Sequence, residues 1–134
     1  MATLVGVRVL IVGGMLNLAL SFALGWLLSA KRLRDPITKH HWLLTAHTVS
    51  LQEGLLLLVV AYALAQTRVS AATCNWAAWL LVSASAFQDL SGIVNWLRDT
   101  GDQFAERSTG WIFATINAVL NSAGLALAVW AVLA

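Results

Sequence analysis

Four long apolar stretches dominate the chain and restrict what it can fold into. Each is close to the ~20 residues that a helix needs to cross a bilayer core of ~30 Å. Charged residues make up 10% of the chain, against about 25% in soluble domains. The stretches cover residues 5–29, 42–66, 75–97 and 110–133. We therefore expect an all-α integral membrane protein, a four-helix bundle that forms a single domain over residues 1–134.

Basic residues in the connections predict the orientation. The first and third connections carry Lys31, Arg32, Arg34, Lys39, Arg98 and Arg107, and the opposite side has Arg8 and Arg68. The positive-inside rule places those two connections in the cytoplasm and both termini outside, on the same side of the membrane. We expect a multi-pass protein of a bacterial-type inner membrane, with the first stretch retained as a span and not cleaved as a signal.

Several common kinds of site are not indicated. The basic excess, with a pI of about 9.2, follows from topology, so we expect membrane lipid and no nucleic acid as a partner. Cys74 is the single cysteine, which excludes an internal disulfide framework and a C-x-x-C-H haem attachment motif. Five tryptophans near the predicted helix ends are typical of interfacial anchors: Trp26, Trp42, Trp76, Trp96 and Trp111.

Polar residues inside the spans carry the functional signal. An ionisable residue within a membrane helix indicates a functional site by default, and here these residues are His47, Glu53 and Asp89. Counting from the cytoplasmic helix ends at 1.5 Å per residue gives two layers, roughly 8–12 Å and about 18 Å deep. The first holds Ser21, His47, Asp89 and Asn117, and the second holds Asn17, Glu53, Ser85 and Asn121.

Some of these polar residues have a simpler interpretation. Ser, Thr and Asn side chains often join membrane helices by hydrogen bonds worth about 0.6 kcal/mol each, which we prefer for Asn17, Ser21, Ser50, Thr115 and Ser122. Asn117 and Asn121 lie on one helix face and fit either role. For His47, Glu53 and Asp89 we prefer function, because a buried ion pair is a costly way to join helices.

The face around His47 suggests a planar ligand. At 100° per residue Ser50 and Gly54 share its side of the helix, whereas Glu53 points about 120° away. A glycine two turns from the imidazole would leave a flat shelf, which is compatible with haem held by one axial histidine, although small residues also let helices approach each other. His40 and His41 lie at the membrane edge. A single deep imidazole would leave the iron an open position, which favours chemistry over electron transfer.

The segment AHTVSLQEG followed by LLLL resembles the start of the second helix in the small membrane isomerases that include styrene oxide isomerase and hydroxylaminobenzene mutase. In that family A-H, six residues and G open a long apolar run. The similarity extends to chain length, the four-helix layout and the AFQDL stretch. The resemblance implies that His47 binds ferric haem b between subunits of a homotrimer, and that the iron acts as a Lewis acid.

Three departures distinguish this chain from the styrene oxide enzyme. Glu53 and Asp89 stand where that enzyme has asparagines, and Ile93 stands where it has a tyrosine. These departures disfavour epoxide isomerisation, and the short chain is close in length to hydroxylaminobenzene mutase. We therefore expect the activity of that enzyme, which forms 2-aminophenol in the degradation of aromatic nitro compounds. Glu53 and Asp89 would transfer protons, while Asn117 and Asn121 would bind the substrate's NHOH group. A styrene oxide-type epoxide isomerase and a small proton-coupled multidrug-type transporter remain alternatives.

Overall fold

The structure is a computed structural model that describes residues 3–133, with side chains from residue 5 onward. It contains α1 (Thr3–Arg34), α2 (His41–Ala65), α3 (Ala71–Leu97) and α4 (Thr109–Leu133). All four are long and apolar enough to cross a membrane. The predicted all-α membrane architecture is therefore confirmed.

Two helices extend beyond the predicted stretches for local reasons. α1 continues past residue 29 through Lys31, Arg32 and Arg34, because cations are favourable in the last turn of a helix, near the negative end of its dipole. α3 begins at Ala71, four residues before the expected start, because the Ser70 side chain caps it by accepting a hydrogen bond from the backbone N–H of Thr73. Hydropathy alone does not contain either signal.

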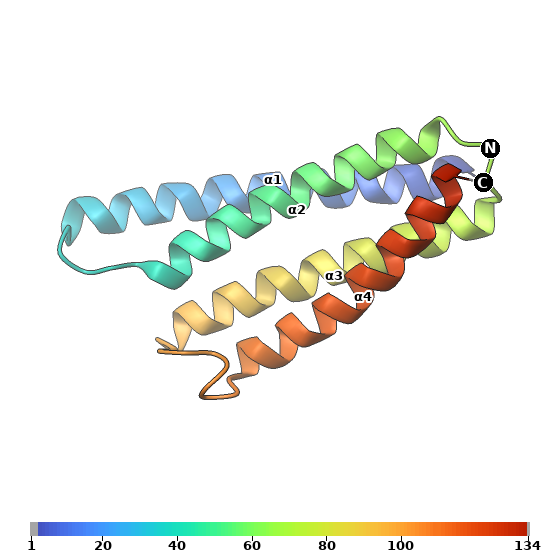
Figure 1. Cartoon of the computed structure of the whole chain (residues 1–134). Helices are drawn as coiled ribbons and strands as arrows, with labels where there is room; N and C mark the ends of the chain where they lie inside the picture. The colour runs from blue at the N-terminus through green and yellow to red at the C-terminus, as the bar shows by residue number, and fades with distance from the viewer. Residues whose placement is uncertain (1–2, 134) are drawn as a thin grey trace.

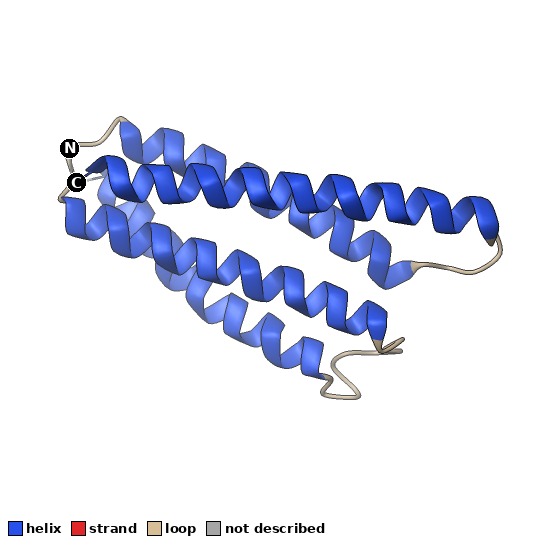
Figure 2. Ribbon diagram, turned by 180° about the vertical axis from the view of Figure 1, so that it is seen from behind, coloured by secondary structure: helices blue, strands red, loops and turns tan. Residues whose placement is uncertain are grey.

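The helices form two hairpins, α1–α2 and α3–α4. Figure 1 shows that α1 begins and α4 ends at the same end of the bundle, where the α2–α3 connection also lies. The hairpins diverge toward the opposite end, and the reverse view in Figure 2 shows the same divergence. Extensive packing joins α1 to α2 and α3 to α4, whereas α2 and α4 touch little. The two basic connections lie together at the divergent end; that this end faces the cytoplasm stays a prediction.

Two apolar clusters form the interior. The larger fills the end near the termini and includes Leu10, Leu57, Leu64 and Leu81. The smaller lies nearer the basic connections and consists of Leu24, Leu28, Leu43 and Ala46, with Leu20 and Trp96 packed against it. Along α1 and α2 the membrane-embedded polar residues fall between these two clusters. The fold therefore encloses a polar layer between two apolar ones.

The third connection is tied firmly to the helix ends. Asn95 is fully buried; its Nδ2 donates to Gln103 Oε1 at 2.9 Å and its Oδ1 accepts from Ser108 Oγ at 2.8 Å. Trp42 Nε1 donates to the carbonyl oxygen of Thr100. The last bond joins the two hairpins at the end where they diverge.

Candidate functional site

The imidazole of His47 lies in the seam between α2 and α1. Its Nδ1 is 2.8 Å from the carbonyl oxygen of Ser21 and 3.1 Å from Ser21 Oγ. The Ser21 hydroxyl donates to the carbonyl oxygen of His47 at 2.9 Å. A carbonyl oxygen can only accept, so this geometry assigns the proton to Nδ1 and leaves the lone pair of the neutral ring on Nε2.

A glycine on α1 makes room for the ring. A Cβ at Gly25 would lie 3.0 Å from His47 Cε1 and 3.2 Å from Nδ1, a closer approach than ordinary van der Waals contact. Ser21 and Gly25 are four residues apart and thus share one face of α1. The sequence analysis assigned Ser21 to a hydrogen bond between helices and did not single out Gly25. The four-residue spacing of the two was the signal that could have identified Gly25 as a neighbour of His47.

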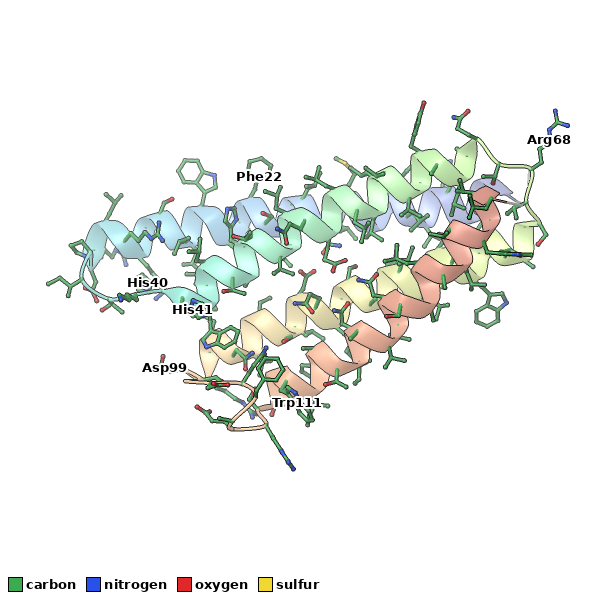
Figure 3. All side chains as sticks on the ribbon, in the orientation of Figure 1. Phe22, His40, His41, Arg68, Asp99 and Trp111 are labelled. Atoms are coloured by element: carbon green, nitrogen blue, oxygen red, sulfur yellow. The ribbon has the colours of Figure 1, made fainter. Side chains whose placement is uncertain are left out.

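Nε2 opens toward the outside of the protomer. The ring is partly exposed. Nε2 makes no hydrogen bond to any described residue, and it is not buried. The surrounding surface is apolar: Leu51, one turn along α2, is exposed, and so are Phe22 (labelled in Figure 3) and Trp26 beside the Ser21 face of α1. The free nitrogen therefore lies in a surface that lipid or another protein chain would cover.

Gly54 does not form the predicted shelf beside His47. A Cβ at Gly54 would lie 3.0 Å from the carbonyl oxygen of Gly14 and 3.0 Å from the Leu18 side chain, both on α1. Gly54 is buried, and its missing side chain lets the two helix backbones meet, the usual role of small residues between membrane helices. The expected open surface at Gly54 is therefore wrong for the protomer.

Enlarging Gly54 is expected to reduce stability. A Gly54→Leu change should destabilise the protein by about 1 to 3 kcal/mol, because the added carbons overlap α1. Thermal unfolding in detergent would measure the loss. Ala65→Leu, which adds the same side chain at an exposed position of α2, is the matched control. Equal melting temperatures for the two variants would contradict the packing role of Gly54.

Ser50 and Asp89 form a bond between α2 and α3. Ser50 Oγ donates to Asp89 Oδ1 at 2.5 Å, and Ser50 is fully buried. The hydroxyl is thus directed to α3 and away from the His47 seam. The prediction that Ser50 shares a cofactor surface with His47 is not supported by this contact, whereas its alternative role as a helix tie is.

Among the described acids, Glu53 alone has a buried carboxyl oxygen without a hydrogen-bond partner. Its Oε2 is buried without a hydrogen-bond partner, and it lies one turn along α2 from Ser50, whose hydroxyl donates to Asp89 on α3. The structure therefore brings together the two acids that the sequence singled out. It places them on the α3 side of α2, away from His47.

The amides of α4 complete the polar layer. Asn117 Nδ2 donates to Gln88 Oε1 at 2.7 Å, while Asn117 Oδ1 and Asn121 Oδ1 are both buried without a partner. Two adjacent residues of α3 thus contact different helices: Gln88 contacts α4, and Asp89 contacts α2. With Glu53 the layer holds three unpartnered acceptor oxygens. A ligand bearing N–H or O–H donors would satisfy them, because buried polar atoms normally have partners.

The site residues therefore form two groups on opposite edges of the buried face of α2. His47, Ser21 and Gly25 form the α1–α2 seam, and Glu53, Asp89, Gln88, Asn117 and Asn121 form the acceptor layer. Within residues 3–133 no three His, Cys, Asp or Glu side chains gather as ligands for a bare metal ion. At the α1–α2 seam the described residues therefore offer one such ligand, the imidazole of His47.

No protein-family model, curated protein or solved structure matches this chain. Its function is therefore inferred from the geometry described above and from the resemblance in its second helix.

Proposed function

We propose that the protein is a membrane isomerase that converts an arylhydroxylamine, hydroxylaminobenzene in the simplest case, into 2-aminophenol. It would act as a homotrimer with ferric haem b held by His47. The observation that carries this proposal is the state of the imidazole: Nδ1 is bound to the Ser21 carbonyl at 2.8 Å and Nε2 is open. Metal-ligating histidines almost always donate their other ring N–H to such an acceptor, which fixes the ring and its tautomer.

The surroundings of His47 are compatible with a haem that is bound at the surface of a protomer and has His47 as its one axial ligand from that protomer. Leu51, Phe22 and Trp26 are exposed apolar side chains near the seam, and a macrocycle needs apolar cover. Bound ferric haem supplies a Lewis acid that polarises an N–O bond. Nε2 opens outward, whereas the acceptor layer lies on the other side of α2. A second protomer would therefore have to cover the seam, so that one substrate could reach both the haem held by His47 and an acceptor layer.

The acceptor layer fits the substrate's polar group. An arylhydroxylamine has an apolar ring, which partitions into lipid, and an NHOH group with one N–H and one O–H donor. Asn117 Oδ1 and Asn121 Oδ1, buried and unpartnered, would accept those hydrogens and orient the group. In the rearrangement the N–O bond breaks, a C–O bond forms at the ortho carbon, the ring loses a proton and the nitrogen gains one. Glu53 and Asp89 would move these protons.

A proton-coupled transporter of organic cations is the second candidate. The buried Glu53 Oε2, which has no hydrogen-bond partner, favours it, because a membrane carboxyl can bind a proton or a cation in turn. Absorbance separates the two proposals. Protein made with ample haem should show a strong Soret band if it is the isomerase, and no such band would support the transporter.

The seam also yields a prediction for Gly25. A Gly25→Leu change would displace the imidazole, because even one added carbon lies 3.0 Å from His47 Cε1. We expect haem affinity to fall by about tenfold to a hundredfold, the usual effect of disturbing a ligand's supporting contacts. Haem titration followed by absorbance measures it. Ala23→Leu, at an exposed position of the same helix, should bind haem normally. Equal affinities in both variants would refute the seam as the haem site.

A further inference from the structure

A basic hollow lies at the divergent end of the bundle, apart from the seam and the acceptor layer. It is an open cavity of about 630 Å³ around the α1–α2 connection, and its lining includes Arg32, Ile37, Lys39, His40 and His41. A second hollow of about 360 Å³ shares Lys39, His40 and His41 and reaches Trp96 and Asp99 of the other hairpin. Figure 3 shows His40 and His41 where the connection enters α2, at the same end as Asp99 and Trp111.

Arg32 and Lys39, the cations of this hollow, have no partner in the part of the chain that the structure describes. Among the described residues neither Arg32 nor Lys39 makes a hydrogen bond or an ion pair. His40 Nε2 is buried and makes no hydrogen bond to the described residues. A buried donor or acceptor without a partner costs free energy. An acceptor-rich anion would satisfy the histidine and both cations at once.

Asp35 interacts electrostatically with His40, but among the described residues no acid forms an ion pair with Arg32 or Lys39. Asp35 is engaged by its own connection, accepting hydrogen bonds from the Thr38 side chain and from the backbone N–H groups of Thr38 and Ile37. The Thr38 hydroxyl is the main reason that the pKa of the Asp35 carboxyl lies below its ordinary value. Asp99 lines only the smaller hollow. Within residues 3–133 the charges of Arg32 and Lys39 are therefore not paired with a carboxylate.

Two exposed apolar side chains indicate what kind of anion would bind. Leu33 is 86% exposed and Ile37 is 91% exposed, and they flank the cations at the point where the span of α1 ends. Dissolved phosphate has nothing to pair with such side chains. A phospholipid does, because its phosphate lies at the level of the cations and its acyl chains reach the apolar groups, and basic pockets at helix ends are known to bind anionic headgroups.

We propose that this hollow binds the headgroup phosphate of an anionic phospholipid. Arg32, Lys39 and the ring of His40 would contact the phosphate oxygens, while Leu33 and Ile37 contact the acyl region. The site is independent of the proposed isomerase activity, since none of these residues belongs to the seam or the acceptor layer. It lies beside Trp42, whose indole joins the two hairpins through Thr100, so a bound lipid would contact the connection next to that link.

Native mass spectrometry of the full chain in detergent tests the proposal. The probes are phosphatidylglycerol, phosphatidylcholine with the same acyl chains, and inorganic phosphate. We expect phosphatidylglycerol to bind at least about tenfold more tightly than phosphatidylcholine, because each basic residue near an anionic lipid contributes about a fivefold gain in affinity. Inorganic phosphate at the same concentration should not displace the lipid.

Variants locate the site. Arg32→Gln combined with Lys39→Gln should weaken phosphatidylglycerol binding by roughly twenty-fivefold, and Lys39→Gln alone by about fivefold. Four basic residues remain at that end in the double variant, against two at the other, so its predicted orientation is kept. Arg68→Gln, at the opposite end of the bundle, is the matched control and should bind like the parent.

Three results would overturn the lipid site. They are equal affinity for the two lipids, unchanged phosphatidylglycerol affinity in the double variant, and displacement of the lipid by inorganic phosphate, which would identify a site for the free ion. Among residues 3–133 neither Arg32 nor Lys39 has a hydrogen-bond or ion-pair partner, so both variants should keep the parent's helix content. The melting temperature should stay close to the parent's, because the double variant loses only the small stabilisation that Arg32 gives as a cation in the last turn of α1. These two quantities are measured alongside binding, and the single variant serves if the double one is unstable.

Discussion

Replacing His47 by alanine is expected to remove haem from the protein. Nε2 of His47 supplies the lone pair that would bind iron at the α1–α2 seam. Ser21 and Gly25 have no side-chain nitrogen or sulfur that could replace it. Haem affinity should fall well beyond the roughly tenfold to hundredfold loss caused by disturbing a supporting contact. The measurement is haem per protein after purification, by absorbance and by extraction of the porphyrin.

His41→Ala is the matched control, because His41 is exposed at the start of α2. It should leave the Soret band and haem content unchanged. The assignment is refuted if the His47→Ala protein keeps the parent's haem content and spectrum, or if both histidine variants lose haem equally.

The second large effect is expected at Glu53. A Glu53→Gln protein should fold and keep its haem, but lose roughly a hundredfold to ten-thousandfold in turnover of hydroxylaminobenzene, the usual contribution of general acid–base catalysis. The amide has nearly the shape of the acid but cannot exchange a proton in this way. Glu53 Oε2 is buried without a partner and is thus free to meet a substrate.

Asp89→Asn should have the smaller effect of the two. Asp89 Oδ1 already accepts the Ser50 hydroxyl at 2.5 Å, and an asparagine oxygen can accept the same bond, so the change mainly preserves a helix tie. Asp99→Asn, in the exposed third connection, is the control for loss of a carboxylate. If the Glu53→Gln protein binds haem and turns over like the parent, the acid is structural and takes no part in proton transfer.

The fold could be predicted from the sequence because its determinants are local. Apolar length alone identifies helices that must cross a bilayer, since backbone polar groups in lipid have to be satisfied within each segment. The misplaced helix ends depend on shorter-range chemistry, such as the Ser70 cap of α3. The concentration of polar residues between two apolar clusters also follows from counting along each helix.

The site was only partly predictable, because its contacts depend on how the helices rotate against each other. Counting placed His47 and Ser21 at similar depth but could not show that they touch, and it chose Gly54 where Gly25 is the glycine that admits the imidazole. In the same way, the sequence identified Asp89 and Asn117 as individual residues but not their hydrogen-bond partners. Those partners, Ser50 and Gln88, are set by the packing of α3 between α2 and α4.

Product analysis with the purified, haem-loaded protein tests the central claim most directly. Hydroxylaminobenzene is supplied without any reductant or oxidant, in water enriched in heavy oxygen, and 2-aminophenol is measured by mass spectrometry. An intramolecular hydroxyl shift predicts 2-aminophenol that carries only the substrate's oxygen, formed by the parent and not by the His47→Ala protein. Absence of 2-aminophenol, formation at the same rate by the His47→Ala protein, or incorporation of the heavy oxygen would contradict the account.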